Sequence, residues 1–553
     1  MKSKVLHILT LCTLMVLLCF YTDAVFAQKD TSTPQTVTIM SAYQPEIRPA
    51  AKMNFSGSAL PADTTKLVRS YKVPVQVLHY SYHPASLEPL HYQMEDSFAQ
   101  GDKYLARLGF GNYTTPYASG AARFNITEKV QLNAYGKYTS SKGNIDNQDY
   151  SILQLKSRAQ MELTGMEAFA GVGYSRRQHY QYGYDHSKYT FEKAQLNQQF
   201  NDLEIFAGFK NTSANSLGIY VSPTISVDMF SKKDSLTENN ILIHVPARKK
   251  INDDFFASLD LDIDNTRYHT QNFYQGDFAI INNVFRFHPS VDYHGRYFTA
   301  HGGLNAFRSF KQWYFMPDVT IDAPLPGTRF IIQAGWVSSL QKNTIKQLSA
   351  INPYINTLPD QFNTRESEIY GGIKASVGKH VYFTCKASYI QYHNFQLFVN
   401  DTSLTNDGRG FLISNEPLMN NFRLHGDVSY IIQNKFSLTG KIDINAYSGL
   451  AVNKKAWHTV PVECSATLKW QILKDWNVNG DFYFFGGGYY LERGNQSGSF
   501  NGGADFSLGA DYKINQHFGT FIRFNNIFGK KYERWHNYPV YGINGLLGVS
   551  CRF

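Results

Sequence analysis

Apolar and polar residues alternate one by one along most of the chain after about residue 102. In the segment 436–447, FSLTGKIDINAY, every second residue is apolar or glycine and the residues between them are polar or Tyr. The segments 257–264 and 506–514 follow the same rule. Similar alternation occurs at 130–139, 422–430, 476–485 and 518–525. Because successive side chains of a strand point to opposite faces, the pattern predicts β-strands with one apolar and one polar face.

The segments are joined alternately by short polar turns and by longer polar loops. The short turns fall at Thr127-Glu128, Thr164-Gly165, Thr212–Asn215, Asn252-Asp253, His294-Gly295, Leu325–Gly327, Gly378-Lys379, Gln433-Asn434, Lys474-Asp475 and Asn515-Gln516. The longer loops are 139–150, 179–199, 341–365, 400–417, 488–498 and 529–539. A soluble β-sandwich also alternates, but short turns at one end and long loops at the other are typical of a transmembrane barrel.

The spacing of the turns predicts the number of strands. If the chain enters and leaves the sheet on the side of the short turns, these turns imply about 22 strands, with an error of about two. A sheet with unpaired edges cannot lie in lipid, so the sheet should close. The expected fold class is all-β, a transmembrane antiparallel β-barrel over residues 102–553.

The first residues resemble a secretory signal. Residues 1–27 contain Lys2 and Lys4, then the apolar run Val5–Tyr21, then the small-residue sequence Ala24-Val25-Phe26-Ala27. This order predicts a cleavable signal peptide; the alternative is an uncleaved anchor. Residues 28–101 are rich in Pro, Thr, Ser and Ala, and we expect them to form a periplasmic segment or a partial plug.

Composition agrees with a barrel. Aromatic residues make up 15% of the chain, and no later apolar run is long enough for a membrane helix. Half of each barrel strand faces lipid and half faces water, with aromatic residues at both interfaces. The formal net charge of +9 suits lipid headgroups or an anionic solute better than nucleic acid, although scattered loop charges also explain it. We therefore expect no nucleic-acid partner.

Three cysteines follow the predicted signal peptide: Cys385, Cys464 and Cys551. They are far apart, and each lies in a strand-like run. We interpret them as small apolar side chains and not as a disulfide framework or a metal site.

No segment indicates catalysis or a cofactor. The sequence contains no G-x-S-x-G, H-E-x-x-H or P-loop motif. His79, His83 and His91 do not form a metal-ligand pattern, so no metal ligands are predicted. Charged side chains on the polar faces should line the lumen, where they either set solute selectivity or only keep the interior polar: Asp260, Asp262, Asp264, Arg423, His425, Asp427, Asp481, Asp511, Lys513 and Arg523.

The C-terminal residues carry a resemblance to a known family. An N-x-F sequence followed by a K-Y-E-like turn occurs at Asn526, Phe528, Lys531, Tyr532 and Glu533. This resembles the last two strands of TonB-dependent receptors, which are outer-membrane barrels.

The final strand resembles the signal that barrel-assembly machinery reads. Phe553 is the last residue, Gly548 lies five residues earlier, and Cys551 is near the penultimate apolar position of that signal. Leu546 stands where the signal has a polar residue. The resemblance implies barrel-assembly machinery as a partner.

The N-terminal segment resembles short receptor-like barrels of Bacteroidota. The family motif there is Y-x-P-x-I-x-x-A-x-K followed by P-x-x-D-T. It is roughly matched by Tyr43, Pro45, Ile47, Ala50 or Ala51 and Lys52, and then by Pro61, Asp63 and Thr64. TonB-dependent receptors carry a folded plug domain, and residues 28–101 are too few for a full one.

A TonB-box-like segment lies within Thr36–Ala42 (TVTIMSA), and its candidate residues are Thr36, Val37, Thr38, Ile39 and Met40. A TonB box adds a strand to its energy-coupling partner, which requires a free, β-prone segment. The alternative is an ordinary extended linker or the N-terminal strand of the family.

Two hypotheses about function follow. The first is a TonB-dependent receptor-like protein that moves a solute across the outer membrane, with TonB or a periplasmic or lipoprotein partner. The second is a non-transporting scaffold that helps to assemble, export or anchor envelope proteins. An open diffusion porin is less compatible with this strand number. None of these is an enzyme.

Overall fold

The computed structural model describes residues 103–233, 236–270, 278–356, 363–401, 407–432, 435–492 and 496–553. The predicted signal peptide, the segment 28–101 and the TonB-box-like residues lie outside this range.

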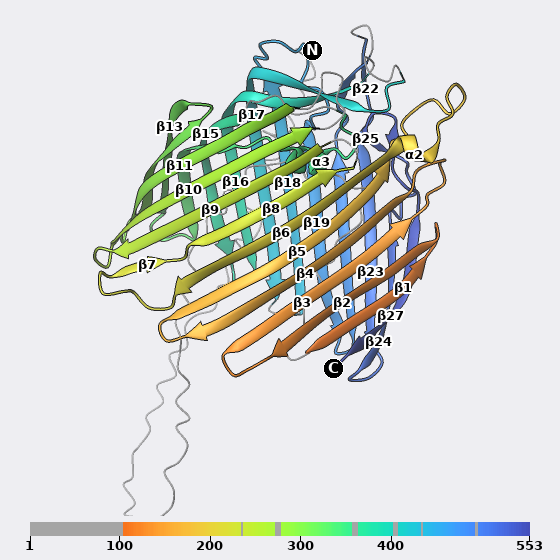
Figure 1. The fold of residues 1–553 in the computed structure, drawn as a ribbon. Helices are drawn as coiled ribbons and strands as arrows, with labels where there is room; N and C mark the ends of the chain where they lie inside the picture. The colour runs from red at the N-terminus through yellow and green to blue at the C-terminus, as the bar shows by residue number, and fades with distance from the viewer. Residues whose placement is uncertain are drawn as a thin grey trace, which may run out of the picture. The chain divides into compact units, whose positions relative to one another are not determined.

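Long antiparallel strands make up almost all of the described chain (Figure 1). They are β1 (Tyr104–Gly111), β2 (Thr115–Asn125), β3 (Val130–Ser141), β4 (Tyr150–Leu163), β5 (Met166–Tyr180), β6 (Asn197–Asn211), β7 (Ile219–Val221), β8 (Thr224–Lys232), β9 (Leu236–Lys250), β10 (Phe255–Thr270), β11 (Phe278–His294), β12 (Thr299–Ser309), β13 (Gln312–Pro324), β14 (Phe330–Gln341), β15 (Thr364–Val377), β16 (Val381–Asn400), β17 (Phe411–Ile432), β18 (Phe436–Ser448), β19 (Val462–Leu473), β20 (Trp476–Phe485), β23 (Gly503–Lys513), β24 (Phe518–Asn525) and β27 (Asn544–Arg552).

These strands form one closed sheet. Each strand pairs with its neighbours along the chain, and β1 pairs with β27 from Leu105↔Arg552 to Gly111↔Leu546. The sheet contains 23 strands, but the three-residue β7 pairs with the same β9 as β8 does, so the barrel has 22 strand positions. The predicted fold class and strand number are confirmed.

Smaller elements lie in the loops. They are α2 (Lys193–Leu196), α3 (Ile345–Ile351), β21 (Tyr489–Leu491), β22 (Ser497–Ser499), β25 (Glu533–Trp535) and β26 (Tyr538–Pro539). Neither of these helices, within the described residues, is long and apolar enough to cross a membrane.

Nine of the ten predicted short turns fall where one strand of the sheet ends and the next begins, and the tenth, Gln433-Asn434, lies outside the described residues. In Figure 1 the C-terminus lies at the lower end, and α2, α3, β22 and β25 lie at the upper end. The loop at 449–461, between β18 and β19, is also long, and the sequence pattern did not single it out. The upper end therefore carries the loops that can form a binding site.

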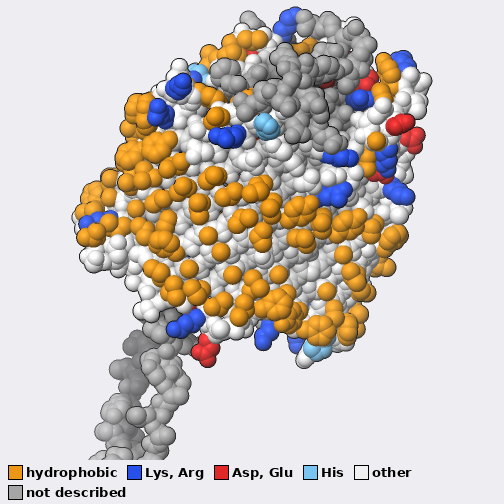
Figure 2. Space-filling model, viewed as in Figure 1, with side chains coloured by type: hydrophobic (Ala, Val, Ile, Leu, Met, Phe, Trp, Pro, Cys, Tyr) orange, Lys and Arg blue, Asp and Glu red, His pale blue; other side chains and the backbone are white. Residues whose placement is uncertain are grey.

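The two faces of the sheet differ in chemistry. Large apolar side chains such as Leu108, Phe110 and Leu547 are about 60% exposed on the outer face. Apolar side chains cover a broad band of the visible outer face in Figure 2, and most of the visible Lys and Arg side chains lie near its edges. An apolar band with charged edges is the surface that a lipid bilayer requires.

The three cysteines are free and lie in strands. Cys385 pairs with Ile373, Cys464 pairs with Ile442, and both of these isoleucines are exposed on the outer face. Cys551 lies two residues after Val549 in β27 and so points to the same face, and Val549 is exposed there too. All three therefore occupy lipid-facing positions, as small apolar side chains can.

A pair of glycines permits the closure of the barrel. Gly109 and Gly548 are opposite each other in the β1–β27 ladder, and the ring of the buried Phe521 covers both. A Cβ on Gly548 would lie 2.3 Å from the carbonyl oxygen of Leu108 and 2.3 Å from Phe521 Cζ. Only glycine leaves room for this close approach.

Gly548→Ala should destabilise the barrel by about 1–3 kcal/mol, because the added methyl group forces the closing strands apart. The measurement is the temperature at which the folded, fast-migrating band is lost in SDS gels. Gly371→Ala in β15 is the matched control, because a Cβ there meets nothing within 4 Å. An equal loss in both variants would contradict this account of the seam.

Candidate functional site

The inner face of the sheet carries polar side chains that pair across neighbouring strands. Asp262 contacts His244 Nδ1 at 2.5 Å and Arg286 Nη1 at 3.0 Å. His425 lies between Asp443 at 2.8 Å and Asp427 at 3.2 Å. Strand alternation therefore placed these predicted charges correctly on the inner face.

The other predicted lumen residues for which contacts are resolved also have partners. Three of the aspartates form ion pairs: Asp260 with His288, Asp264 with Lys342, and Asp511 with Arg107. Asp481 accepts a hydrogen bond from Thr467, and Arg423 donates to Asn445 and Tyr392. The Arg523 guanidinium lies over the Phe521 ring. Most of these charges are thus engaged with the protein itself.

The loop between β14 and β15 reaches a distant part of the barrel wall. The loop between β14 and β15 contains α3, and Lys346 of α3 pairs with Asp202 on β6 at 3.0 Å and with Asp228 on β8 at 2.7 Å. Five strands, β9 to β13, separate β8 from β14 along the sheet. The loop therefore folds inward over the lumen instead of extending away from the barrel.

Hydrogen bonds at the helix N-terminus hold α3 in this position. The hydroxyl of the N-cap residue Thr344 accepts from Gln347 N at 3.2 Å. The carboxylate of Glu238 on β9 accepts from Lys346 N at 3.1 Å. Lys342, just before the helix, pairs with Asp264 on β10 at 2.5 Å. Free N–H groups at a helix start need such acceptors, so the barrel wall itself completes this helix.

Aromatic side chains from separate loops pack together beside α3. This cluster, which we call the loop core, includes Tyr182, Tyr354, Phe411, Trp535 and Tyr538. The rings of Tyr354 and Tyr538 stack with centroids 3.7 Å apart, and Tyr182 meets Tyr538 edge-on at 4.9 Å. Burial of these rings fixes the loops relative to one another.

A buried histidine lies next to the loop core. His458, in the loop 449–461, is 3% exposed, and its Nδ1 contacts the carbonyl of Phe398 at 2.8 Å. Burial lowers the pKa of His458 from 6.5 to about 3, so the imidazole is neutral at physiological pH. It lines a cavity of about 60 Å³ together with Arg423, Arg534 and Trp535.

A larger cleft opens between the loops that join β20 to β23 and β24 to β27. Its volume is about 520 Å³, within the range of small-molecule sites. Lys530 and Lys531 line it and are exposed. Tyr490 and His536 also line it, with their rings stacked at a centroid distance of 3.5 Å. We call it the lysine cleft. Glu533 lines it as well, so it combines two lysines and one carboxylate with an aromatic surface.

Some residues singled out from sequence lie at these sites: Lys531, Tyr532 and Glu533 line the lysine cleft, and Arg423 lines the cavity beside His458. The others lie elsewhere. Gly548 and Cys551 are in β27, and Phe553 pairs through its backbone with Tyr104 at the barrel closure. Thr36 to Met40 lie outside the described residues. The sequence pattern did not single out Lys346, His458 or Lys530. Loop residues have no regular alternation of apolar and polar positions, so the sequence does not show which residues they contact.

Comparisons with known proteins agree with the fold. No family model matches the chain, and no curated protein matches it. Similar solved structures include the FrpB iron transporter from Neisseria meningitidis, with a TM-score of 0.65 at 8% identity and 81% of each chain covered. The siderophore receptor PirA from Acinetobacter baumannii has a TM-score of 0.62 at 10% identity, covering 81% of this chain and 80% of that one.

The copper transporter OprC has a TM-score of 0.59 at 12% identity, covering 82% of this chain and 80% of that one. At these identities the similarity shows the fold alone. The class is therefore a 22-strand transmembrane barrel of the architecture found in outer-membrane receptors.

Lys346→Met should loosen the loop between β14 and β15, because it leaves Asp202 and Asp228 facing each other without a cation. The Lys346 side chain is 33% exposed, so we expect a local cost of about 1–2 kcal/mol. Hydrogen exchange of residues 342–356 should then rise roughly tenfold. Lys188→Met, which removes an exposed pair with Asp185, is the control and should leave this segment unchanged.

Acid should open the loop core through His458. When the loop is open, the imidazole is exposed and binds a proton below about pH 6.5. When the loop is folded, the buried imidazole binds a proton only near pH 3. The folded loop therefore loses stability as pH falls through this window. Between pH 7 and 5 the loss is about 2 kcal/mol, or roughly 30-fold faster exchange in 449–461 after correction for intrinsic rates. His458→Asn should remove this component, and an unchanged pH dependence in that variant would refute it.

Proposed function

We propose that this protein is a receptor of the outer membrane that takes up a small solute through its barrel. The observation that carries the proposal is the folding of the long loops over one end of a closed 22-strand barrel, with the lysine cleft among them. A barrel of this width has a lumen that must be filled or covered, and known transporters of this size carry a plug. Loops that cover one mouth and form a cleft there fit selective binding better than free diffusion.

The chemistry of the cleft suggests the class of solute. Lys530 and Lys531 attract an anion, and the stacked Tyr490 and His536 offer a flat apolar surface. The chain's formal charge of +9 points the same way. An anionic solute with an aromatic or planar part satisfies both features, and the metal-chelate and metal transporters among the similar structures make an anionic metal chelate a reasonable first probe.

Energy coupling and origin belong to the same proposal. Residues Thr36 to Met40 would contact TonB by adding a strand, the segment 28–101 would act as a short periplasmic element in place of a full plug, and the source would be a member of the Bacteroidota. The resemblance of the N-terminal motifs supports these points.

Uptake assays test the proposal. Cells that produce the full-length protein should accumulate a radiolabelled anionic ferric–catecholate complex several-fold above cells that lack it, and a protonophore should abolish the difference. Lys530→Gln/Lys531→Gln should lower uptake roughly tenfold at low solute concentration, because two cations leave the cleft. Lys454→Gln, an exposed lysine in another loop, should have no effect.

The scaffold hypothesis predicts a different result. In that case no ferric–catecholate, ferric–hydroxamate or copper(II) complex accumulates, and purification in mild detergent recovers assembly or secretion proteins in stoichiometric amounts. That combination of outcomes would reject uptake.

A further inference from the structure

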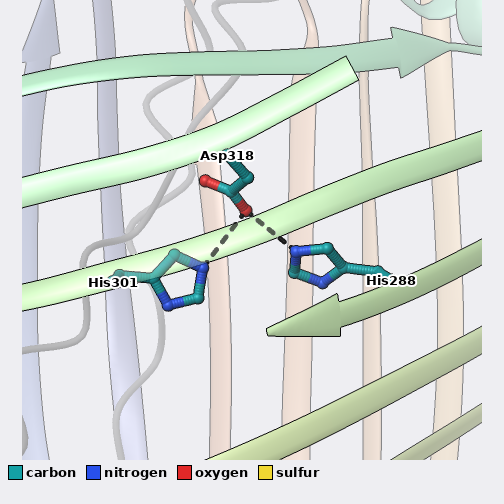
Figure 3. A group of neighbouring side chains, drawn as sticks. All are labelled: His288, His301 and Asp318. Atoms are coloured by element: carbon teal, nitrogen blue, oxygen red, sulfur yellow. Dashed lines mark ion pairs between the residues drawn. The ribbon is translucent and has the colours of Figure 1, made fainter. Parts of the chain in front are cut away.

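Three neighbouring strands bring two histidines and an aspartate together on the inner face of the barrel (Figure 3). His288 is on β11, His301 on β12 and Asp318 on β13. Asp318 Oδ2 lies 3.1 Å from His288 Nε2 and 3.5 Å from His301 Nε2. The donor atoms of all three lie within 4.8 Å of one another. We propose that these residues form a binding site for a divalent transition-metal ion such as Zn²⁺.

The separations fit metal coordination. Zinc bonds of about 2.0–2.1 Å in tetrahedral geometry place neighbouring ligand atoms roughly 3.3 Å apart. The two contacts of Asp318 Oδ2 fall on either side of this value. The donor atoms all lie within 4.8 Å of one another, so the side chains must draw together to coordinate one ion.

Two buried polar atoms in the cluster have no hydrogen bond. His288 is 5% exposed and Asp318 is 7% exposed, yet neither His288 Nε2 nor Asp318 Oδ1 has a hydrogen-bond partner. His288 Nε2 has only the ion pair with Asp318 Oδ2 at 3.1 Å, at an angle that is poor for a hydrogen bond. Leaving such atoms unsatisfied is costly, and a coordinated cation would satisfy them.

The second nitrogen of each histidine is held by another carboxylate. His288 Nδ1 lies 3.3 Å from Asp260 Oδ2, and His301 Nδ1 lies 2.7 Å from Asp292 Oδ1. A carboxylate behind a metal-bound histidine fixes the tautomer, so that Nδ1 carries the hydrogen and Nε2 presents its lone pair. Both histidines have this arrangement, and both point Nε2 toward Asp318.

A glycine makes the convergence possible. Gly303 pairs with Ser290 on one side and with Asp318 on the other, so it lies between the two rings. A Cβ at Gly303 would be 2.7 Å from His288 Nε2 and 3.2 Å from His301 Nε2. Any side chain here would push the rings apart.

The surrounding charge also favours a cation. With neutral histidines, the carboxylates outnumber the arginines around the cluster by two: Asp260, Asp262, Asp292 and Asp318 against Arg248 and Arg286. A divalent ion would balance this difference. Two protonated imidazoles would balance it equally well, so experiment must separate the two states.

The donor set selects the class of metal. Two imidazole nitrogens and one carboxylate suit Zn²⁺, Cu²⁺, Ni²⁺ or Fe²⁺, whereas Mg²⁺ and Ca²⁺ prefer oxygen alone. The side chain of His301 is 25% exposed, and a fourth ligand, either water or a donor atom of a solute, can enter on that side. This site is independent of the lysine cleft and of the uptake proposal.

Metal titration of the full-length protein in detergent, without a histidine tag and after treatment with EDTA, tests the site. Wild type should bind one equivalent of Zn²⁺ by calorimetry, and Co²⁺ should give the visible absorption of a tetrahedral site. Asp318→Asn and His288→Gln/His301→Gln should each weaken binding at least a hundredfold, and an excess of Mg²⁺ should not compete. Gly303→Ala should weaken binding with all three ligands intact.

His425→Gln is the matched control, because His425 also faces the lumen between two aspartates, and the described residues place no second histidine in a ligand group with it. It should bind Zn²⁺ as wild type does. Heat-modified mobility in SDS gels shows that each variant is folded. If wild type binds no Zn²⁺, or if the ligand variants bind it equally well, the site is refuted and the cluster is a set of protonated histidines paired with aspartates.

Discussion

The closure of the sheet is the constraint on which the rest of this structure depends. A backbone N–H or C=O group that faces lipid without a partner costs several kcal/mol, and only a sheet without edges avoids this cost. The ladder between β1 and β27 removes both edges, and the backbone of Phe553 completes it by exchanging hydrogen bonds with Tyr104. Phe521 and the glycines beside it let these two strands approach. Without this seam, no other feature would persist in a membrane.

Closure then separates the side chains into two sets. One face meets lipid and carries Leu, Ile, Val, Phe and the three cysteines, and the other encloses charged and polar groups. Inside the barrel these groups find partners on neighbouring strands, as Asp262 does with His244 and Arg286. The same rule brings histidines from adjacent strands toward one aspartate. A metal site in the wall would thus arise from ordinary strand register with the addition of one glycine.

The loops at one end extend the polar interior into a folded cap. Ion pairs from Lys342 and Lys346 anchor the loop between β14 and β15 to strands β6, β8 and β10, and the loop core joins it to loops from three other hairpins. The anchors are charged, and that of Lys346 is partly exposed, whereas the loop core is mainly aromatic and buried. A cap held in this mixed way can keep its shape at rest and still open at moderate cost, which is what a solute-binding mouth requires.

The sequence by itself determined the barrel: a period of two fixes which face each residue occupies, and the turn spacing fixes the strand number. It therefore predicted the 22 strands and the inward direction of Asp260, Asp262, His425 and Asp511. It could not predict which inward residues contact each other. The alternation of apolar and polar residues does not define the register between neighbouring strands, nor any distance across the lumen. His288, His301 and Asp318 come together only through the pairing of β11, β12 and β13, and Lys346 reaches Asp228 only because its loop turns inward. Those contacts join residues far apart in the chain, and only the tertiary structure decides them.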